Sequence, residues 1–209
     1  MIKKIKEMIS PDSKESEDKK IILIDPTGGA PKEPDLRIVG LFSEVNEEKI
    51  AEVIHSVLFF DALNKQSEPD EQKPITFYLS TYGGNADDMF AMYDTMRIIR
   101  ETSEINTVGL GKVMSAGVLL LAAGTKGKRQ IGKNCRVMIH SVMGGNHGNL
   151  HNMMNEMEAI EQLQDMYCEA LIAESNLTRA KLKKMIERKV NVYLSAEEAV
   201  ELGIADEII

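Results

Sequence analysis

The sequence has no tryptophan, few aromatic residues and only two cysteines, and these shortages limit the kind of core, disulfide and metal site that the protein can have. Aromatic residues make up 5% of the chain while methionine occurs 13 times, so we expect an aliphatic core in which methionine fills irregular gaps. Cys135 and Cys168 lack metal-ligand spacing and are too few for a disulfide framework. We therefore interpret both as small buried hydrophobic residues and expect no metal in the protein.

Long apolar runs and an excess of positive charge are also absent. No segment reaches the length of a membrane span, and the opening MIKKIKEMISPDSKE lacks the apolar stretch of a secretory signal, so we expect a cytoplasmic protein with no membrane partner. The formal net charge of -8 repels a nucleic-acid backbone, so we expect no nucleic-acid partner. The sequence has no GxxxxGK[ST] phosphate loop, so any ATP would be consumed by a separate protein.

The chain divides into an N-terminal arm and one folded domain. Residues 1–36 combine charge runs with four prolines and a Gly-Gly pair, so we expect a flexible arm with one plausible strand at 21–24. From residue 37 to residue 209, short apolar segments alternate with longer amphipathic segments. This alternation is typical of βα units stacked around a mostly parallel sheet, so we predict an α/β domain.

The expected elements of this domain follow from periodicity and capping. Asn46 caps a first helix with apolar positions up to Leu58, and a second helix carries a buried face of methionines from Met89 to Ile99. The helix 116–123 is apolar on all sides and must be buried, and a capping box from Ser195 opens a last helix that Gly203 closes. A long helix is expected at 149–174, and strands at 37–42, 75–80, 105–110, 129–132, 136–140 and the C-terminus.

Ser115 lies where a strand leads through GKVMSAG into the buried helix. At such a turn a serine exposes its hydroxyl next to backbone N–H groups, which suits nucleophilic attack on a carbonyl. The structural alternative is a serine that caps the helix.

His140 closes the apolar strand and precedes a glycine-rich stretch, so it is placed to act as a general base; the alternative is a structural histidine. His147 and His151 have a spacing of four residues without a third ligand, which does not support a metal site.

Four blocks of sequence resemble the successive motifs of the Clp protease proteolytic subunit family. They are YLSTYGGNADDMFAMYDTMR, GKVMSAGVLLLAAGTKGKR, RVMIHSVMGGNHG and YLSAEEAVELGIADEII. The resemblance covers 37–209 and implies a Clp protease/crotonase-like spiral of ββα units with a protruding handle helix at 149–174. It also implies heptameric rings stacked as a tetradecamer, a polypeptide substrate, a Clp-type ATPase unfoldase as partner, and no cofactor.

The resemblance assigns roles to individual residues. Ser115 becomes the nucleophile of a serine endopeptidase and His140 its general base, with the oxyanion hole formed by the N–H groups of Gly84 and Ala116. The substrate would pair as an added strand at the glycine-rich stretch, and the ATPase would dock on an apolar surface. The residues implied are Gly144, Gly145 and Gly148 for the substrate and Tyr78 and Ile98 for docking.

The sequence departs from the family at several positions. Asn191 occupies the position of the third triad residue, which is an aspartate in the family. Its amide oxygen can accept a hydrogen bond from the Nδ1–H of His140, but it has no negative charge to stabilise the imidazolium. Val190 replaces an arginine that, in the family, pairs with the triad aspartate of the opposing ring. Both partners of this ion pair are therefore absent, so neither leaves an unpaired charge. We expect the handle helices to hold any double ring together. Tyr82 replaces a proline before the glycine pair, and Thr76 and Gln130 replace aromatic docking residues.

Three alternatives remain open on these residues. A non-catalytic or weakly active ring subunit is consistent with Asn191. A crotonase-type acyl-CoA enzyme would share the fold and an oxyanion hole but would need neither Ser115 nor His140. A phage-type processing peptidase of the same fold, acting without an ATPase, would fit the altered docking positions.

Overall fold

The computed structural model describes residues 36–145, 147–187 and 191–209, and residues 37–209 form one compact unit. The strand expected at 21–24 lies outside the described residues, and so does Val190. The division of the chain into an arm and a domain stays a prediction. No helix in the described residues has both the length and the apolar character needed to cross a membrane.

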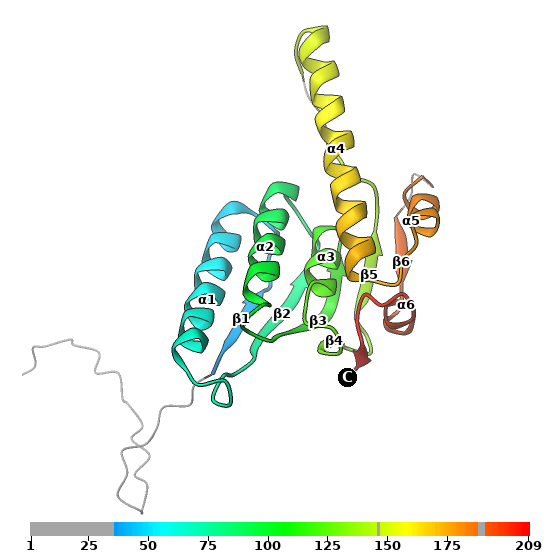
Figure 1. Ribbon diagram of the computed structural model, residues 1–209. Coiled ribbons are helices and arrows are strands. Elements are labelled where there is room, and N and C mark those ends of the chain that lie inside the picture. The colour runs from blue at the N-terminus through cyan, green and yellow to red at the C-terminus, as the bar shows by residue number, and fades with distance from the viewer. Residues whose placement is uncertain (1–35, 146, 188–190) are drawn as a thin grey trace, which may run out of the picture. The chain divides into compact units, whose positions relative to one another are not determined.

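A mostly parallel sheet runs through this unit (Figure 1). Its main path consists of parallel neighbours in the order β1 (Ile38–Leu41), β2 (Ile75–Thr81), β3 (Ile105–Met114), β4 (Arg129–Ile131) and β7 (Glu207–Ile208). The second half of β3 pairs in parallel with β5 (Arg136–Ile139), and β6 (Val192–Leu194) pairs antiparallel with β5. The predicted α/β class with a mostly parallel sheet is therefore confirmed.

Three helices cover one face of the sheet in Figure 1: α1 (Glu47–Gln66), α2 (Ala86–Ile99) and α3 (Ala116–Ala122). Asn46 caps α1 as predicted, by accepting a hydrogen bond from the N–H of Lys49. The methionine face of α2 and all of α3 are buried, as their periodicity indicated. Alternate residues of β2 from Ile75 to Thr81 are buried beneath these helices, because side chains on a strand point to opposite faces in turn.

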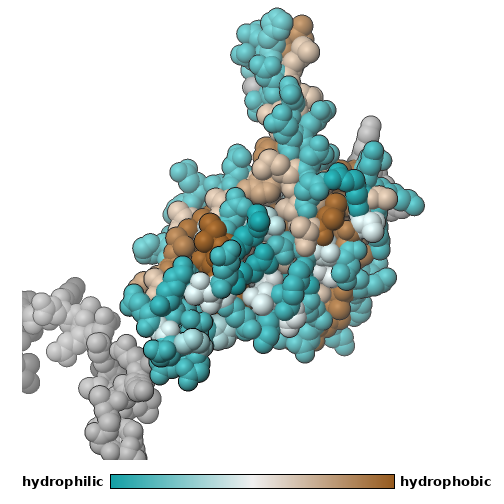
Figure 2. Space-filling view, viewed as in Figure 1, coloured by the Kyte–Doolittle hydropathy of each residue, from teal (hydrophilic) through white to brown (hydrophobic). Residues whose placement is uncertain are grey.

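The remaining helices lie beyond this layer. They are α4 (Leu150–Glu174), α5 (Arg179–Ile186) and α6 (Ala196–Glu201). The expected capping box from Ser195 opens α6, and Gly203 follows its end. In Figure 1, α4 projects away from the sheet, and Figure 2 shows a few apolar side chains among the hydrophilic ones on this projection. The exposed apolar residues of α4 are Leu150, Met153, Met154, Met157 and Met166.

Three features differ from the expectation. The third strand does not end near 110: it bends at Gly111, where φ is +66°, and continues to Met114 because its last residues pair with β5. The elements α5 and β6 were not anticipated. Cys135 is buried, but Cys168 is only partly buried, beside a groove of about 240 Å³ between α4 and α5, so the expectation of two buried cysteines is wrong for Cys168.

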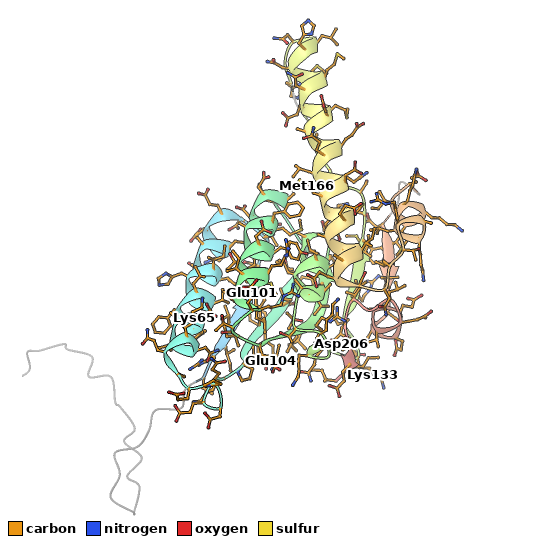
Figure 3. All side chains as sticks on the ribbon, in the orientation of Figure 1. Lys65, Glu101, Glu104, Lys133, Met166 and Asp206 are labelled. Atoms are coloured by element: carbon orange, nitrogen blue, oxygen red, sulfur yellow. The ribbon has the colours of Figure 1, made fainter. Side chains whose placement is uncertain are left out.

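The base of α4 is fixed to the body by Glu174. Its carboxylate accepts hydrogen bonds from Arg100 at 2.7 and 3.0 Å and from the hydroxyl of Tyr93 at 3.2 Å. Its backbone carbonyl accepts a hydrogen bond of 2.7 Å from Arg129, which also pairs with Asp206, a residue labelled in Figure 3. These bonds hold the C-terminal end of α4 against the sheet while its N-terminal part projects.

Candidate active site

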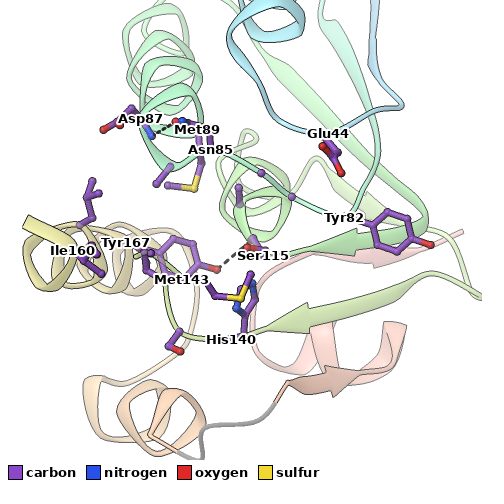
Figure 4. Close-up of a pocket in the computed structure, with 18 of the residues that line it drawn as sticks. Glu44, Tyr82, Asn85, Asp87, Met89, Ser115, His140, Met143, Ile160 and Tyr167 are labelled. Atoms are coloured by element: carbon purple, nitrogen blue, oxygen red, sulfur yellow. Dashed lines mark hydrogen bonds between the residues drawn. The ribbon is translucent and has the colours of Figure 1, made fainter. Parts of the chain in front are cut away.

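A cleft of about 550 Å³ opens where four parts of the chain meet (Figure 4). They are the loop after β2 with the start of α2, the start of α3, the segment that follows β5, and α4; Glu44, which follows β1, also lines the cleft. Ser115 and His140 both line this cleft, as do Gly84 and Ala116. The structure thus brings together four residues that the sequence analysis singled out from three separate segments.

Ser115 has a backbone conformation that residues other than glycine rarely adopt. Its φ of +53° is the single positive value at a residue other than glycine in the described ranges. It lies directly between the end of β3 and the start of α3, and its side chain does not cap that helix. The helix-cap interpretation therefore fails, and the strained turn resembles those that hold a nucleophilic hydroxyl at an active site.

Two glycines make room for this turn. Gly83 and Gly84 have φ values of +99° and +152°, and a Cβ atom on Gly83 would lie 2.6 Å from the Cβ of Ser115. A Cβ atom on Gly84 would overlap the backbone of Val45. Only glycine at both positions lets the loop pass this close to the serine.

The backbone around the serine leaves two N–H groups suited to an oxyanion. Val45 clamps the glycine loop, since its N–H bonds the Gly83 carbonyl at 2.8 Å and its carbonyl accepts from Asn85 at 2.9 Å. Within the described residues, neither Gly84 N–H nor Ala116 N–H donates to a protein acceptor. Ala116 is the first residue of α3, where the helix dipole favours negative charge. These two groups can therefore stabilise a developing oxyanion.

His140 follows the last residue of β5 and is partly exposed in the cleft. Figure 4 shows its imidazole and the Ser115 side chain extending toward one another from opposite sides. In the described structure no hydrogen bond joins the two side chains. Such bonds are often long in enzymes without substrate, so the arrangement remains suitable for a general base.

Asn191 directly precedes β6, as His140 directly follows β5. In the antiparallel pair, Ile139 lies opposite Val192, so the strand pairing ends one residue short of both of them. Asn191 is exposed, does not line the cleft and makes no hydrogen bond to His140 in the described structure. A contact between Asn191 and His140 therefore stays a prediction.

The other predicted site residues are spread more widely. Gly144 and Gly145 line the rim of the cleft, whereas Gly148 does not. Tyr78 is half-buried on β2 and Ile98 is exposed near the end of α2, both outside the cleft. Their docking role stays a prediction.

Sequence reasoning missed the floor of the cleft. Met89 from α2 and three residues of α4 line it: Ile160, Leu163 and Tyr167. Tyr167 is 5% exposed, and its hydroxyl donates to the Ser115 carbonyl at 3.3 Å (Figure 4). The helical spacing of these three residues could have indicated one buried face of α4, but not that this face meets the nucleophile.

No metal-binding group is formed by the described residues: three or more His, Cys, Asp or Glu side chains do not converge anywhere among them.

Comparisons with known proteins agree with this arrangement. The family model described as Clp protease matches residues 34–209. An ATP-dependent Clp protease proteolytic subunit of Dehalococcoides mccartyi is 35% identical over 173 residues, which cover 83% of this chain and 82% of that protein. The ATP-dependent Clp protease proteolytic subunit 3 of a Synechococcus species is 35% identical over 174 residues with the same coverage of both chains.

Proposed function

The chain belongs to the Clp protease family, and we propose that it is a serine endopeptidase subunit in which Ser115 is the nucleophile and His140 the general base. The observation that carries this proposal is the strained, positive-φ conformation of Ser115 in a cleft that it shares with His140. A crotonase-type enzyme would require neither residue, and the family match leaves that alternative without support.

The reaction begins with acylation of the serine. The Ser115 Oγ attacks the carbonyl carbon of the scissile peptide bond while His140 takes the hydroxyl proton. Collapse of the tetrahedral intermediate breaks the C–N bond, and the imidazolium returns its proton to the leaving amine. Water then attacks the acyl-enzyme with His140 again as base, which releases the carboxylic acid and restores Ser115.

The tetrahedral oxyanion is stabilised by the N–H groups of Gly84 and Ala116. Both are backbone donors held by the glycine loop and by the start of α3, so they need little reorganisation during the reaction. In comparable sites one such donor contributes about 10²- to 10³-fold to turnover.

Substrate binding relies on backbone contacts and an apolar floor. The segment with Gly144 and Gly145 borders the cleft and would pair with a peptide as an added strand, a mode that reads little sequence. The floor of Met89, Ile160 and Leu163 suits an apolar side chain next to the scissile bond. Unfolded polypeptide is therefore the proposed substrate.

The proposed assembly is supported by the family match and by the projecting helix. We propose a cytoplasmic subunit that forms heptameric rings stacked as a tetradecamer, with the exposed apolar side chains of α4 in contact between rings. A Clp-type ATPase would feed the chamber and dock near Tyr78 and Ile98. An ATPase-independent processing peptidase of the same fold would differ only in this last step.

One observation favours a second candidate, a ring subunit with weak or no catalysis. Asn191 brings no charge and does not contact His140 in the described structure. If the amide does not orient the imidazole, turnover would fall by several orders of magnitude, because the wrong histidine tautomer would dominate.

Labelling with a fluorophosphonate separates the two candidates, because it requires an activated serine but no ATPase. We expect the purified, assembled protein to be labelled at Ser115, as located by peptide mass spectrometry. The Ser115→Ala and His140→Ala variants should remain unlabelled.

The absence of labelling in assembled protein would contradict the endopeptidase proposal and favour the weakly active subunit. In that case the Asn191→Asp variant should restore labelling, since a carboxylate that accepts from His140 stabilises the imidazolium.

A further inference from the structure

The backbone of Ser115 is held in its strained conformation by three hydrogen bonds from three different elements. Its N–H donates to the Met138 carbonyl of β5 at 2.8 Å. Its carbonyl accepts from the N–H of Val118 in α3 at 3.0 Å and from the hydroxyl of Tyr167 in α4 at 3.3 Å. A conformation that costs about 1–3 kcal/mol persists only when its surroundings constrain it.

These three bonds are not equivalent. The bond from Val118 lies within the first turn of α3, so it moves with Ser115 and cannot fix the serine relative to the rest of the cleft. The bond to Met138 ties the serine to the strand that leads to His140. The Tyr167 hydroxyl is the group that ties it to α4 (Figure 4).

Tyr167 is well suited to hold this position. Its side chain is 5% exposed and packs in the part of α4 that belongs to the core, so its ring has little freedom to move. Burial raises the pKa of Tyr167 well above its ordinary value, so the hydroxyl remains a protonated donor over the whole working pH range. The C-terminal end of the same helix is anchored through Glu174 to Arg100.

We propose that Tyr167 is a positioning residue that keeps Ser115 in its reactive conformation through the hydrogen bond from its hydroxyl to the serine carbonyl. The proposal rests on the function assigned above to Ser115. Tyr167 neither transfers a proton nor contacts the reacting atoms; it makes the geometry of the nucleophile depend on the placement of α4. Without the hydroxyl, the serine spends less time in the attacking geometry, and the chemical step slows while substrate binding does not change.

The test compares Tyr167→Phe with Tyr93→Phe in the full, assembled protein. Both variants remove one hydroxyl from a buried ring, since Tyr93 is 6% exposed and its hydroxyl donates to Glu174 at 3.2 Å. Tyr93 does not line the cleft. Each variant therefore loses one buried hydrogen bond, but only the hydroxyl removed in Tyr167→Phe bonds to Ser115.

We expect Tyr167→Phe to be labelled by the fluorophosphonate about three- to tenfold more slowly than the unaltered protein, which corresponds to the loss of one ordinary hydrogen bond. For a fluorogenic peptide, kcat should fall by a similar factor with KM unchanged. Tyr93→Phe should keep both the labelling rate and kcat.

Three results would overturn the proposal: an unchanged labelling rate in Tyr167→Phe, a raised KM with unchanged kcat, or an equal slowing in both variants. A Tyr167→Met variant, which also lacks the hydroxyl but keeps apolar volume, should show the same loss of kcat even if Tyr167→Phe assembles poorly. If the unaltered protein is not labelled at all, the proposed function fails; if it is labelled and Tyr167→Phe matches it, only the positioning role fails.

Discussion

At the scale of single residues, the conformation of the candidate nucleophile depends on the glycines of the adjacent loop. Ser115 has a φ of +53°, and the loop that passes it has Gly83 with a φ of +99°. A Cβ atom on Gly83 would also lie 2.8 Å from the Met114 carbonyl and 3.1 Å from the Ala116 nitrogen. The unusual backbone conformations of Ser115 and Gly83 together expose the serine hydroxyl next to two backbone N–H donors.

The Gly83→Ala substitution tests this dependence. We expect it to destabilise the fold by about 2–4 kcal/mol, from left-handed strain together with steric overlap, and to slow fluorophosphonate labelling of Ser115 by at least about 100-fold through displacement of the loop. Chemical denaturation and labelling kinetics measure the two effects.

Gly127→Ala is the matched control. Gly127 also has a left-handed φ, of +82°, but a Cβ atom there would meet nothing within 4 Å. It should lose only about 1 kcal/mol and be labelled at the normal rate. Equal labelling of Gly83→Ala and the unaltered protein would contradict the role assigned to the glycine loop.

At the scale of elements, α4 is both a projecting helix and part of the cleft. Its C-terminal half supplies Leu163 and Tyr167 to the cleft floor, and Glu174 ties its end to the body. Burial by itself would raise the pKa of Glu174, but the hydrogen bond and charge of Arg100, together with Lys126, lower it below its usual value of 4.5. The ion pair therefore stabilises the fold chiefly when the carboxylate is charged.

The pH dependence of stability follows from the direction of this shift. Because the pKa of Glu174 is lower in the folded state than in the unfolded state, its contribution is complete above about pH 4.5 and is lost as the pH falls through the folded value. We expect Glu174→Gln to cost about 2–4 kcal/mol at pH 7, since it leaves Arg100 partly buried without its counter-charge.

Urea denaturation at pH 7 and at pH 4 or below measures this dependence. The difference between the unaltered protein and Glu174→Gln should shrink at the lower pH. Glu201→Gln, at an exposed position on α6, should leave stability unchanged at both values. A difference that stays constant with pH would show that the contribution of Glu174 is not electrostatic.

At the scale of the whole molecule, the projecting part of α4 exposes several apolar side chains. Met154 and Met157 are 61% and 60% exposed, in a helix whose N-terminal half is not covered by any other described element. In Figure 2 the projection is mostly hydrophilic, with a few apolar side chains near its tip. In a stacked assembly of two rings, these side chains would be buried against the helices of the opposing ring.

If the protein forms the proposed pair of rings, substitution of both methionines by glutamate should separate them. We expect the Met154→Glu, Met157→Glu protein to show half the mass of the unaltered assembly in native mass spectrometry, because charge placed in an apolar contact disfavours burial. The Met154→Leu, Met157→Leu protein keeps the apolar character and should retain the full mass. An unchanged mass in the glutamate variant would assign ring pairing to another surface.

Several features of the protein were determined by local sequence alone. The methionine face of α2, the fully buried α3 and the caps of α1 and α6 were predicted because each depends on residues within a few positions of one another. The local pattern made Ser115 and His140 candidates, with a helix cap and a structural histidine as alternatives, and the resemblance to the Clp protease family supplied the catalytic roles.

The rest was decided only by tertiary structure, because it depends on pairings between distant segments. Short β6 has too few residues to show an alternating pattern, yet its antiparallel pairing brings Val192, the residue after Asn191, opposite Ile139, the residue before His140. The continuation of β3 past Gly111 is a strand because it pairs with β5 and, at Val113, with the end of β2. Ser115 and Tyr167 are 52 residues apart in the sequence and come into contact because α4 packs against α3. The periodicity of neither helix predicts that contact.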